Sequence, residues 1–87
     1  MNKKNRSTLA AIFEDPIRSD ILWVDIENLL SALGTEIPEG RGSRIRIALK
    51  DVRAVFHRLH PRKVTDTESL KSMRRFLIVV GVKDAEV

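Results

Sequence analysis

The feature that most constrains the fold is the stretch from Ser43 to His57, in which apolar and polar side chains alternate with a period of two. Such alternation places one kind of side chain on each face of a β-strand. The first half, Ser43–Leu49, puts isoleucine and leucine on one face and arginine on the other. Arg53–His57 repeats the pattern, and Lys50-Asp51 between them suits a tight turn. We expect an antiparallel hairpin with one apolar and one cationic face.

Helical periodicity precedes this hairpin. Ser7–Phe13 has the composition of a short helix, which the Asp15-Pro16 pair would stop. A clearer helix ends before Gly34, which stands where a glycine cap belongs. Its apolar positions are Leu22, Ile26, Leu29, Leu30 and Leu33. Trp23 is the single tryptophan, and we expect it to anchor the core.

A third helix is expected over Thr65–Val80, although the β-branched residues near its end would also suit a strand. Thr65 and Glu68 fit a capping box at its start, and Gly81 fits a cap at its end. Four apolar positions form a stripe that faces the core, namely Leu70, Met73, Leu77 and Val80. Three basic positions lie on another face of the helix, namely Lys71, Arg74 and Arg75. Ile78 and Val79 would then be partly exposed, as at a partner interface.

Thr35–Glu39 adds a short edge strand, with Pro38 arguing against a central position in the sheet. The resulting order is α-α-β-β-β-α. It predicts an α+β fold in which helices cover one face of a three-stranded antiparallel sheet. We expect one domain over 1–87, with 1–20 as a helical extension to a core at 21–83.

Composition excludes several classes of protein. The 87 residues suffice for one domain, and the absence of cysteine excludes disulfides, thiolate metal sites and thiol catalysis. No apolar run is long enough to span a membrane, and the polar start lacks the apolar stretch of a signal peptide. We expect a soluble protein of the cytoplasm that needs no cofactor and contacts no membrane.

The net charge of +4 is unevenly distributed along the chain. Residues 1–40 carry four basic and seven acidic side chains, whereas residues 41–75 carry eleven basic and three acidic ones. Eight of those eleven are arginines, which form two-pronged contacts with phosphate that lysine cannot make. Segregation of this size predicts a face that binds a polyanion, although a merely solvated basic surface is the alternative.

Two histidines are the candidate catalytic residues. His57 and His60 have no Asp or Glu within three residues, so the sequence predicts no metal site. Nucleophilic-serine patterns, phosphate-binding loops and dinucleotide motifs are absent. His60-Pro61-Arg62-Lys63 leads toward the start of the third helix, where free N–H groups could bind phosphate. An ordinary turn before an ordinary helix is an equally good interpretation.

Several segments together resemble HicA toxins, the mRNA-cleaving halves of bacterial toxin–antitoxin pairs. They are Gly42-Ser43, His60-Pro61-Arg62-Lys63, the run from Leu70 to Leu77, and Gly81. The resemblance covers roughly residues 24–82. It implies a fold like that of double-stranded-RNA-binding domains, mRNA cleavage without a metal, and neutralisation in a hetero-oligomer with a HicB-type antitoxin.

One position departs from the family pattern. Members have a catalytic histidine after Gly-Ser, and here that position is Arg44. Histidine can exchange protons near neutral pH, whereas arginine stays charged and suits the stabilisation of an oxyanion. Three interpretations follow: Arg44 stabilises charge while His57 or His60 acts as base, the protein binds RNA without cutting it, or Arg44 is a detoxifying change.

The expected functional residues are therefore as follows. The catalytic candidates are Arg44, His57 and His60. The RNA-binding candidates are Arg41, Ser43, Arg46, Arg58, Arg62, Lys63, Lys71, Arg74 and Arg75. The antitoxin is expected to contact Arg44, Ile78 and Val79. A ribonuclease toxin is the leading hypothesis, followed by a non-cleaving RNA-binding module, and then by a DNA-binding or protein-interaction domain built on the first two helices.

Overall fold

A computed structural model describes residues 2–37, 44–60 and 62–82 of the chain. Its elements follow in the order α1 (Lys3–Ile12), α2 (Trp23–Ala32), β1 (Arg44–Leu49), β2 (Val52–His57) and α3 (Thr67–Val80). The α+β class and all three expected helices are confirmed. No helix in the described ranges is both long enough and apolar enough to cross a membrane.

The expected hairpin is confirmed. β1 and β2 pair antiparallel through a two-residue turn, in which Lys50 and Asp51 have φ of 49° and 65°. Positive φ at both positions gives a turn whose twist matches that of the strands. The register pairs Arg44 with His57, Ile45 with Phe56, Arg46 with Val55, Ile47 with Ala54, Ala48 with Arg53 and Leu49 with Val52.

The expected third strand is not formed as a strand in the part of the chain that the structure describes. Glu36 makes a single antiparallel bridge to Ala48, in which each backbone N–H donates to the other residue's carbonyl (N···O 2.8 and 3.2 Å). Within the described ranges the sheet proper has two strands, β1 and β2. Residues 38 and 39 of the expected strand lie outside the described residues. A likeness to double-stranded-RNA-binding domains therefore stays a prediction.

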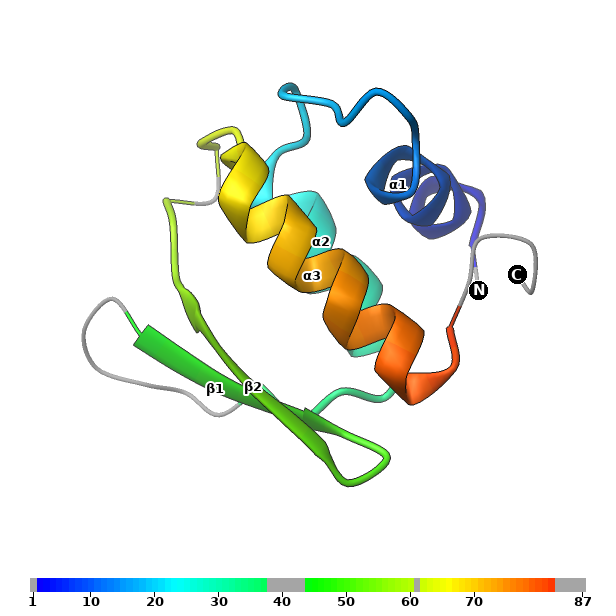
Figure 1. The fold of residues 1–87 in the computed structure, drawn as a ribbon, viewed down its shortest axis with the longest axis vertical. Coiled ribbons are helices and arrows are strands. Elements are labelled where there is room, and N and C mark those ends of the chain that lie inside the picture. The colour runs from blue at the N-terminus through cyan, green and yellow to red at the C-terminus, as the bar shows by residue number, and fades with distance from the viewer. Residues whose placement is uncertain (1, 38–43, 61, 83–87) are drawn as a thin grey trace.

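Helices α2 and α3 pack over the apolar face of the hairpin (Figure 1). Ile45, Ile47 and Leu49 of β1 are buried there, as their alternation predicts. Phe56 of β2 meets Phe76 of α3 edge to face, with ring centroids 6.4 Å apart. The prediction that Trp23 belongs to the core is also confirmed, since it is 1% exposed.

Helix α1 belongs to the same core. Its Leu9 and Ile12 are fully buried, and the helix contacts both α2 and α3. In Figure 1 it lies beside the upper end of α2, on the side away from the hairpin. The expected extension at 1–20 therefore packs against the other helices and shares their apolar core.

The two glycine caps are confirmed and the predicted capping box is wrong. Gly34 and Gly81 follow α2 and α3 with φ of 87° and 88°, a region that glycine adopts without a steric penalty. The cap of α3 is Asp66, whose carboxylate accepts from the Ser69 N–H (3.2 Å). Thr65 is instead 1% exposed, and its N–H donates to the Ile21 carbonyl (2.7 Å). This bond holds Thr65 in the core, so the next residue caps the helix.

Candidate nucleic-acid interface

The outer face of the hairpin carries the polar half of the alternation, and we define it as Arg44, Arg46, Ala48, Arg53, Val55 and His57. Arg44 and His57 stand directly opposite each other, and both are exposed. The backbone groups of Ala48 both bond Glu36, so they point away from β2. The hydrogen-bonding direction repeats every second residue along a strand, so the backbone groups of Arg46 and Arg44 also point away from β2. Arg44 and His57 therefore form a non-hydrogen-bonded pair, the kind in which facing side chains approach most closely.

A shallow hollow lies on this side of the hairpin. Its volume is about 350 Å³, and it is lined by Glu36, Arg46, Ile47, Ala48, Arg53, Ala54 and Val55. Ala48 leaves the space between larger neighbours because its side chain ends at Cβ. Two guanidinium groups and one carboxylate thus border an open depression, next along the strands from the Arg44–His57 pair. Arg53 belongs to this surface although it was not among the predicted site residues. The sequence could have indicated this, because Arg53 lies four residues before His57 and so points to the same face of the strand.

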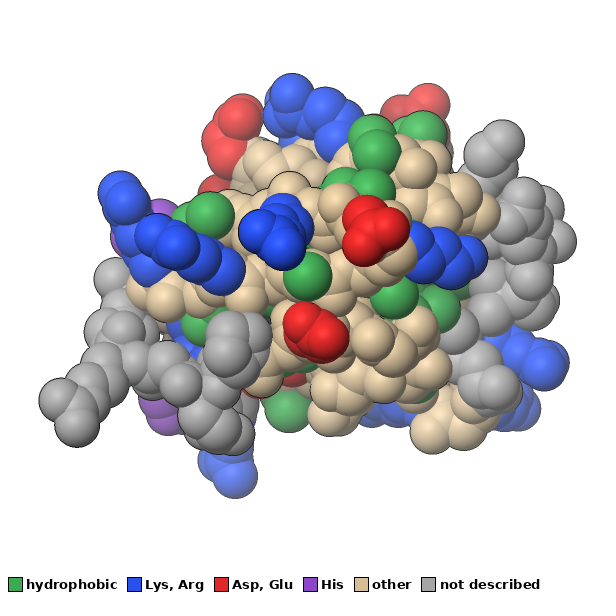
Figure 2. All heavy atoms as spheres, turned by 90° about the horizontal axis from the view of Figure 1, so that it is seen from below, with side chains coloured by type: hydrophobic (Ala, Val, Ile, Leu, Met, Phe, Trp, Pro, Cys, Tyr) green, Lys and Arg blue, Asp and Glu red, His purple; other side chains and the backbone are tan. Residues whose placement is uncertain are grey.

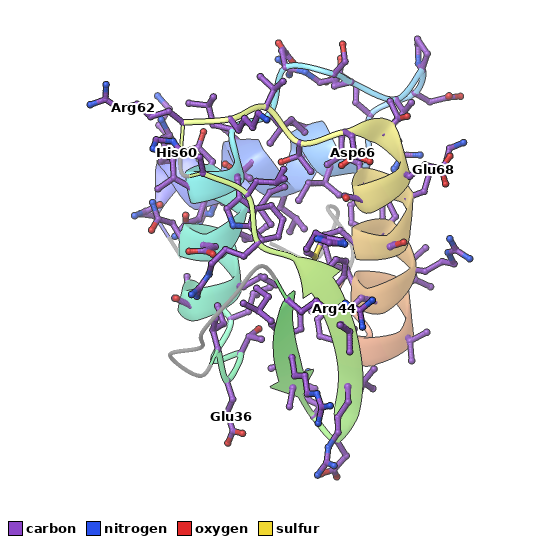
Figure 3. All side chains as sticks on the ribbon, turned by 90° about the vertical axis from the view of Figure 1, so that its left-hand side faces the viewer. Glu36, Arg44, His60, Arg62, Asp66 and Glu68 are labelled. Atoms are coloured by element: carbon purple, nitrogen blue, oxygen red, sulfur yellow. The ribbon has the colours of Figure 1, made fainter. Side chains whose placement is uncertain are left out.

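His60 lies apart from this surface. Figure 3 shows His60 and Arg62 at the end of the molecule away from Arg44 and Glu36. The Nδ1 atom of His60 accepts from the Arg62 N–H (3.2 Å), which closes a local turn. The structure therefore brings His57 to Arg44 and leaves the second histidine elsewhere.

Lys63 and Val64 pair with the backbone at the start of α2 before the chain enters α3. The Lys63 carbonyl accepts from the Trp23 N–H (2.9 Å), and Leu22 pairs with Val64 in an antiparallel bridge. At the start of α3 the Asp66 carboxylate already accepts from the Ser69 N–H. Hydrogen bonds from Ser69 lower the pKa of the Asp66 carboxyl, and the bond from the Ser69 hydroxyl contributes most. The Asp66 side chain is therefore negatively charged at neutral pH. A phosphate at this helix start would therefore compete with a carboxylate for the Ser69 N–H, and the phosphate site stays a prediction.

Arg58 is engaged in a network near α2. Its Nε donates to Oε1 of Glu27 (3.2 Å), and the Trp23 indole N–H donates to the same oxygen (2.7 Å). Both charged side chains are about 70% buried, with exposed fractions of 29% and 28%. The pair closes over the edge of the tryptophan, and the charge of Arg58 is offset by a carboxylate from the acidic first half of the chain.

Arg74 is engaged with α1. Its guanidinium donates through Nε to the Ile12 carbonyl and through Nη2 to the Glu14 carbonyl, at the end of that helix. A cation at this end also meets the negative end of the helix dipole. Lys71 lies 3.7 Å from a carboxylate oxygen of Glu68, on the exposed side of α3. The three basic residues of α3 therefore do not form one group, because Arg74 is bound to the end of α1.

The two apolar residues among the three expected at an antitoxin interface are exposed as predicted, Ile78 by 51% and Val79 by 68%. Val79 borders a groove between α3 and β2, whereas Ile78 lies about 100° away around the helix and does not line that groove. Arg41 and Ser43, predicted to bind RNA, lie outside the described residues. Figure 2, from the side of the hairpin, shows basic side chains in several separate places with acidic ones among them.

Within the described ranges, no three or more His, Cys, Asp or Glu side chains lie together as a metal site would require. No protein-family model matches the chain, and neither a curated protein nor a solved structure matches it either.

Proposed function

We propose that the chain binds RNA through the outer face of the hairpin and cleaves it there without a metal, as the toxin of a toxin–antitoxin pair. The observation that carries this proposal is the exposed cross-strand pair of Arg44 and His57. Arg46 and Arg53 continue the positive charge along the same face, and none of the three arginines makes an ion pair with another described residue. Their charge is therefore available to phosphate.

The chemistry assigns one step to each member of the pair. His57 removes the proton of a ribose 2′-hydroxyl, and the 2′-oxygen attacks the adjacent phosphorus. A 2′,3′-cyclic phosphate forms as the bond from phosphorus to the 5′-oxygen breaks, and that oxygen takes a proton from solvent. Arg44 stabilises the negative charge that develops on the phosphate oxygens, a role that requires a permanent cation. His60 takes no part because it lies away from Arg44.

RNA cleavage in a buffer containing EDTA tests the proposal, and the two histidines provide a matched control. His57→Gln should slow the appearance of fragments ending in 2′,3′-cyclic phosphate by about 100-fold or more. Arg44→Ala should slow cleavage and weaken binding together. His60→Gln should change neither by more than about twofold, because this side chain is remote from the pair. Unchanged cleavage and binding in both His57→Gln and Arg44→Ala would refute the proposal.

A second candidate function is RNA binding without cleavage. It is favoured by the absence of any hydrogen bond from another described side chain to the His57 ring, since catalytic histidines are usually oriented by such a partner. This function predicts retarded RNA in a gel shift but no fragments. Arg44→His distinguishes a silenced enzyme from a simple binder, because cleavage should then appear only in the variant.

The toxin assignment implies a HicB-type antitoxin as partner in a hetero-oligomer. An acidic protein that covered the outer face would exclude RNA by occupying the arginines. Co-expression with the product of the adjacent reading frame tests this part of the proposal. Formation of a stable complex that no longer retards RNA is the expected outcome, and a complex that still binds RNA through Arg46 would contradict it.

A further inference from the structure

Strand β2 has a free edge. It pairs with β1 on one side, and no other described segment pairs with it on the second side. Because Ala48 uses its backbone groups on Glu36, the opposing Arg53 directs its own N–H and C=O away from β1. Val55 and His57 follow with the same orientation, since the pattern repeats every second residue. No backbone hydrogen bond joins these three residues to a described residue outside the hairpin.

A groove runs beside this edge. It has a volume of about 310 Å³ and lies between β2 and α3. The strand lines it from Val52 to Phe56, and the helix adds Ser72, Arg75, Phe76 and Val79. Val55 and Val79 are among the most exposed large apolar side chains, at 57% and 68%. The groove therefore combines unpaired backbone groups with apolar surface along one side.

The charge of the lining indicates what fits. Arg53 and Arg75 are the charged residues among its described lining, and neither makes an ion pair with another described residue. A strand added to β2 would direct alternate side chains to opposite faces. Those on the helix side would meet Phe76 and Val79, and those on the other side would lie beside Arg53 and His57. An added strand that complements this lining therefore alternates apolar residues, facing α3, with acidic residues, facing Arg53 and His57.

We propose that the free edge of β2 receives an extended segment of a partner protein, with alternating apolar and acidic side chains, as an added strand. A second copy of this chain fits less well, because pairing β2 with itself brings the arginines of two identical grooves together without a carboxylate between them. The edge shares Arg53, Val55 and His57 with the outer face, but the backbone groups of these residues and the groove beside α3 take no part in the proposed cleavage. The proposal therefore holds whether or not the chain cleaves RNA.

The probe is a short synthetic peptide of alternating glutamate and valine, added to the full chain. Amide hydrogen exchange followed by NMR should slow at the N–H groups of Arg53, Val55 and His57 by about tenfold at saturation. The N–H of Arg46, which faces the other edge, should exchange unchanged. A peptide with lysine in place of glutamate should bind at least about tenfold more weakly.

Two neighbouring residues of α3 provide matched variants. Val79→Glu should weaken the Glu-Val peptide by about tenfold, because it places a carboxylate in the groove and removes apolar contact. Ile78→Glu should change binding by less than about twofold, because Ile78 lies off the groove. Val55→Pro deletes an edge donor without deleting a hairpin bond, and it should abolish protection at the edge.

Four outcomes of the peptide experiments would overturn the proposal. They are protection that appears on Arg46 instead of on the β2 edge, equal binding of the lysine peptide, equal effects of Val79→Glu and Ile78→Glu, and no binding of the Glu-Val peptide. Concentration-dependent protection of the β2 edge in the absence of peptide, with a dimer in sedimentation, would identify a second copy as the occupant and overturn the choice of an acidic strand.

Discussion

Arg74 was predicted to bind RNA, and its position predicts a structural effect that can be measured directly. Its guanidinium donates to two carbonyls at the end of α1, from Ile12 and Glu14. These residues are 62 and 60 positions away in the sequence, so the contact ties the first helix to the last. Arg74→Ala should therefore loosen α1 from the rest of the core.

The expected loss follows from the two hydrogen bonds. A bond from a charged donor contributes about 1.5–3 kcal/mol when it is at least partly shielded from water, and much less when exposed. The Ile12 bond is part-buried and the Glu14 bond is exposed, so the first should account for most of the effect. Together with the helix-dipole contribution, we expect a loss of about 2 kcal/mol. In a domain of this size that lowers Tm by about 8–16 °C.

Urea unfolding and thermal melts followed by circular dichroism measure this loss. Arg75→Ala is the matched control, because Arg75 is exposed and makes no ion pair with another described residue. Its effect should stay within about 0.5 kcal/mol. A loss below about 0.5 kcal/mol for Arg74→Ala, or equal losses for the two variants, would refute the structural role of Arg74.

Three further substitutions test the local structure. Asp66→Ala should cost about 1 kcal/mol at neutral pH by removing the helix cap; because the folded pKa of Asp66 is lowered from 3.8, the difference from wild type should be full above about pH 4 and disappear as the pH falls through that lowered value. Gly81→Ala should cost about 1 kcal/mol in urea unfolding, since its φ of 88° is unfavourable for any residue with a Cβ. Glu27→Ala should cost about 2 kcal/mol and change the fluorescence of Trp23, because both the indole N–H and Arg58 lose their acceptor.

Each of these has an outcome that would contradict it. A difference between wild type and Asp66→Ala that persisted unchanged down to pH 2 would exclude the carboxylate as the source of the cap. If Gly81→Ala left the free energy of unfolding unchanged, the end of α3 would not depend on the left-handed conformation. Glu27→Gln serves as the control for Glu27→Ala. It keeps an acceptor for the indole, so it should retain most of the fluorescence while losing the ion pair.

The hairpin could be predicted from the sequence because its determinants are local. Ile45 and Ile47 are buried while Arg44 and Arg46 are exposed, and this follows from a period of two along one strand. The edge strand at Thr35 could not be predicted reliably, because a strand needs a partner along its whole length. Among the residues that the structure describes, the pairing of this segment with β1 is limited to the bridge at Glu36.

The functions of individual basic and capping residues depend on distant contacts. Thr65 and Asp66 are both good helix caps, and the choice between them was made by the Ile21 carbonyl, which holds the Thr65 N–H. Arg58 and Arg74 looked like other basic residues of the segment 41–75. Their partners come from α2 and α1, and no pattern within that segment indicates them.

The same contacts change how the excess positive charge of residues 41–75 should be counted. If all eleven basic residues met phosphate, the logarithm of RNA affinity would fall with that of salt with a slope of about −8, at about −0.7 per neutralised phosphate on a single strand. Arg58 is paired with Glu27 and Arg74 is held by carbonyls of α1, while Arg62 lies away from Arg44. The outer face retains Arg44, Arg46 and Arg53, which predicts a slope of about −2. Arg46→Ala should therefore reduce the magnitude of the slope by about 0.7, whereas Arg58→Ala should leave the slope unchanged. A slope near −8 for the unaltered protein would mean that RNA is bound by the whole basic segment rather than by one face of the hairpin.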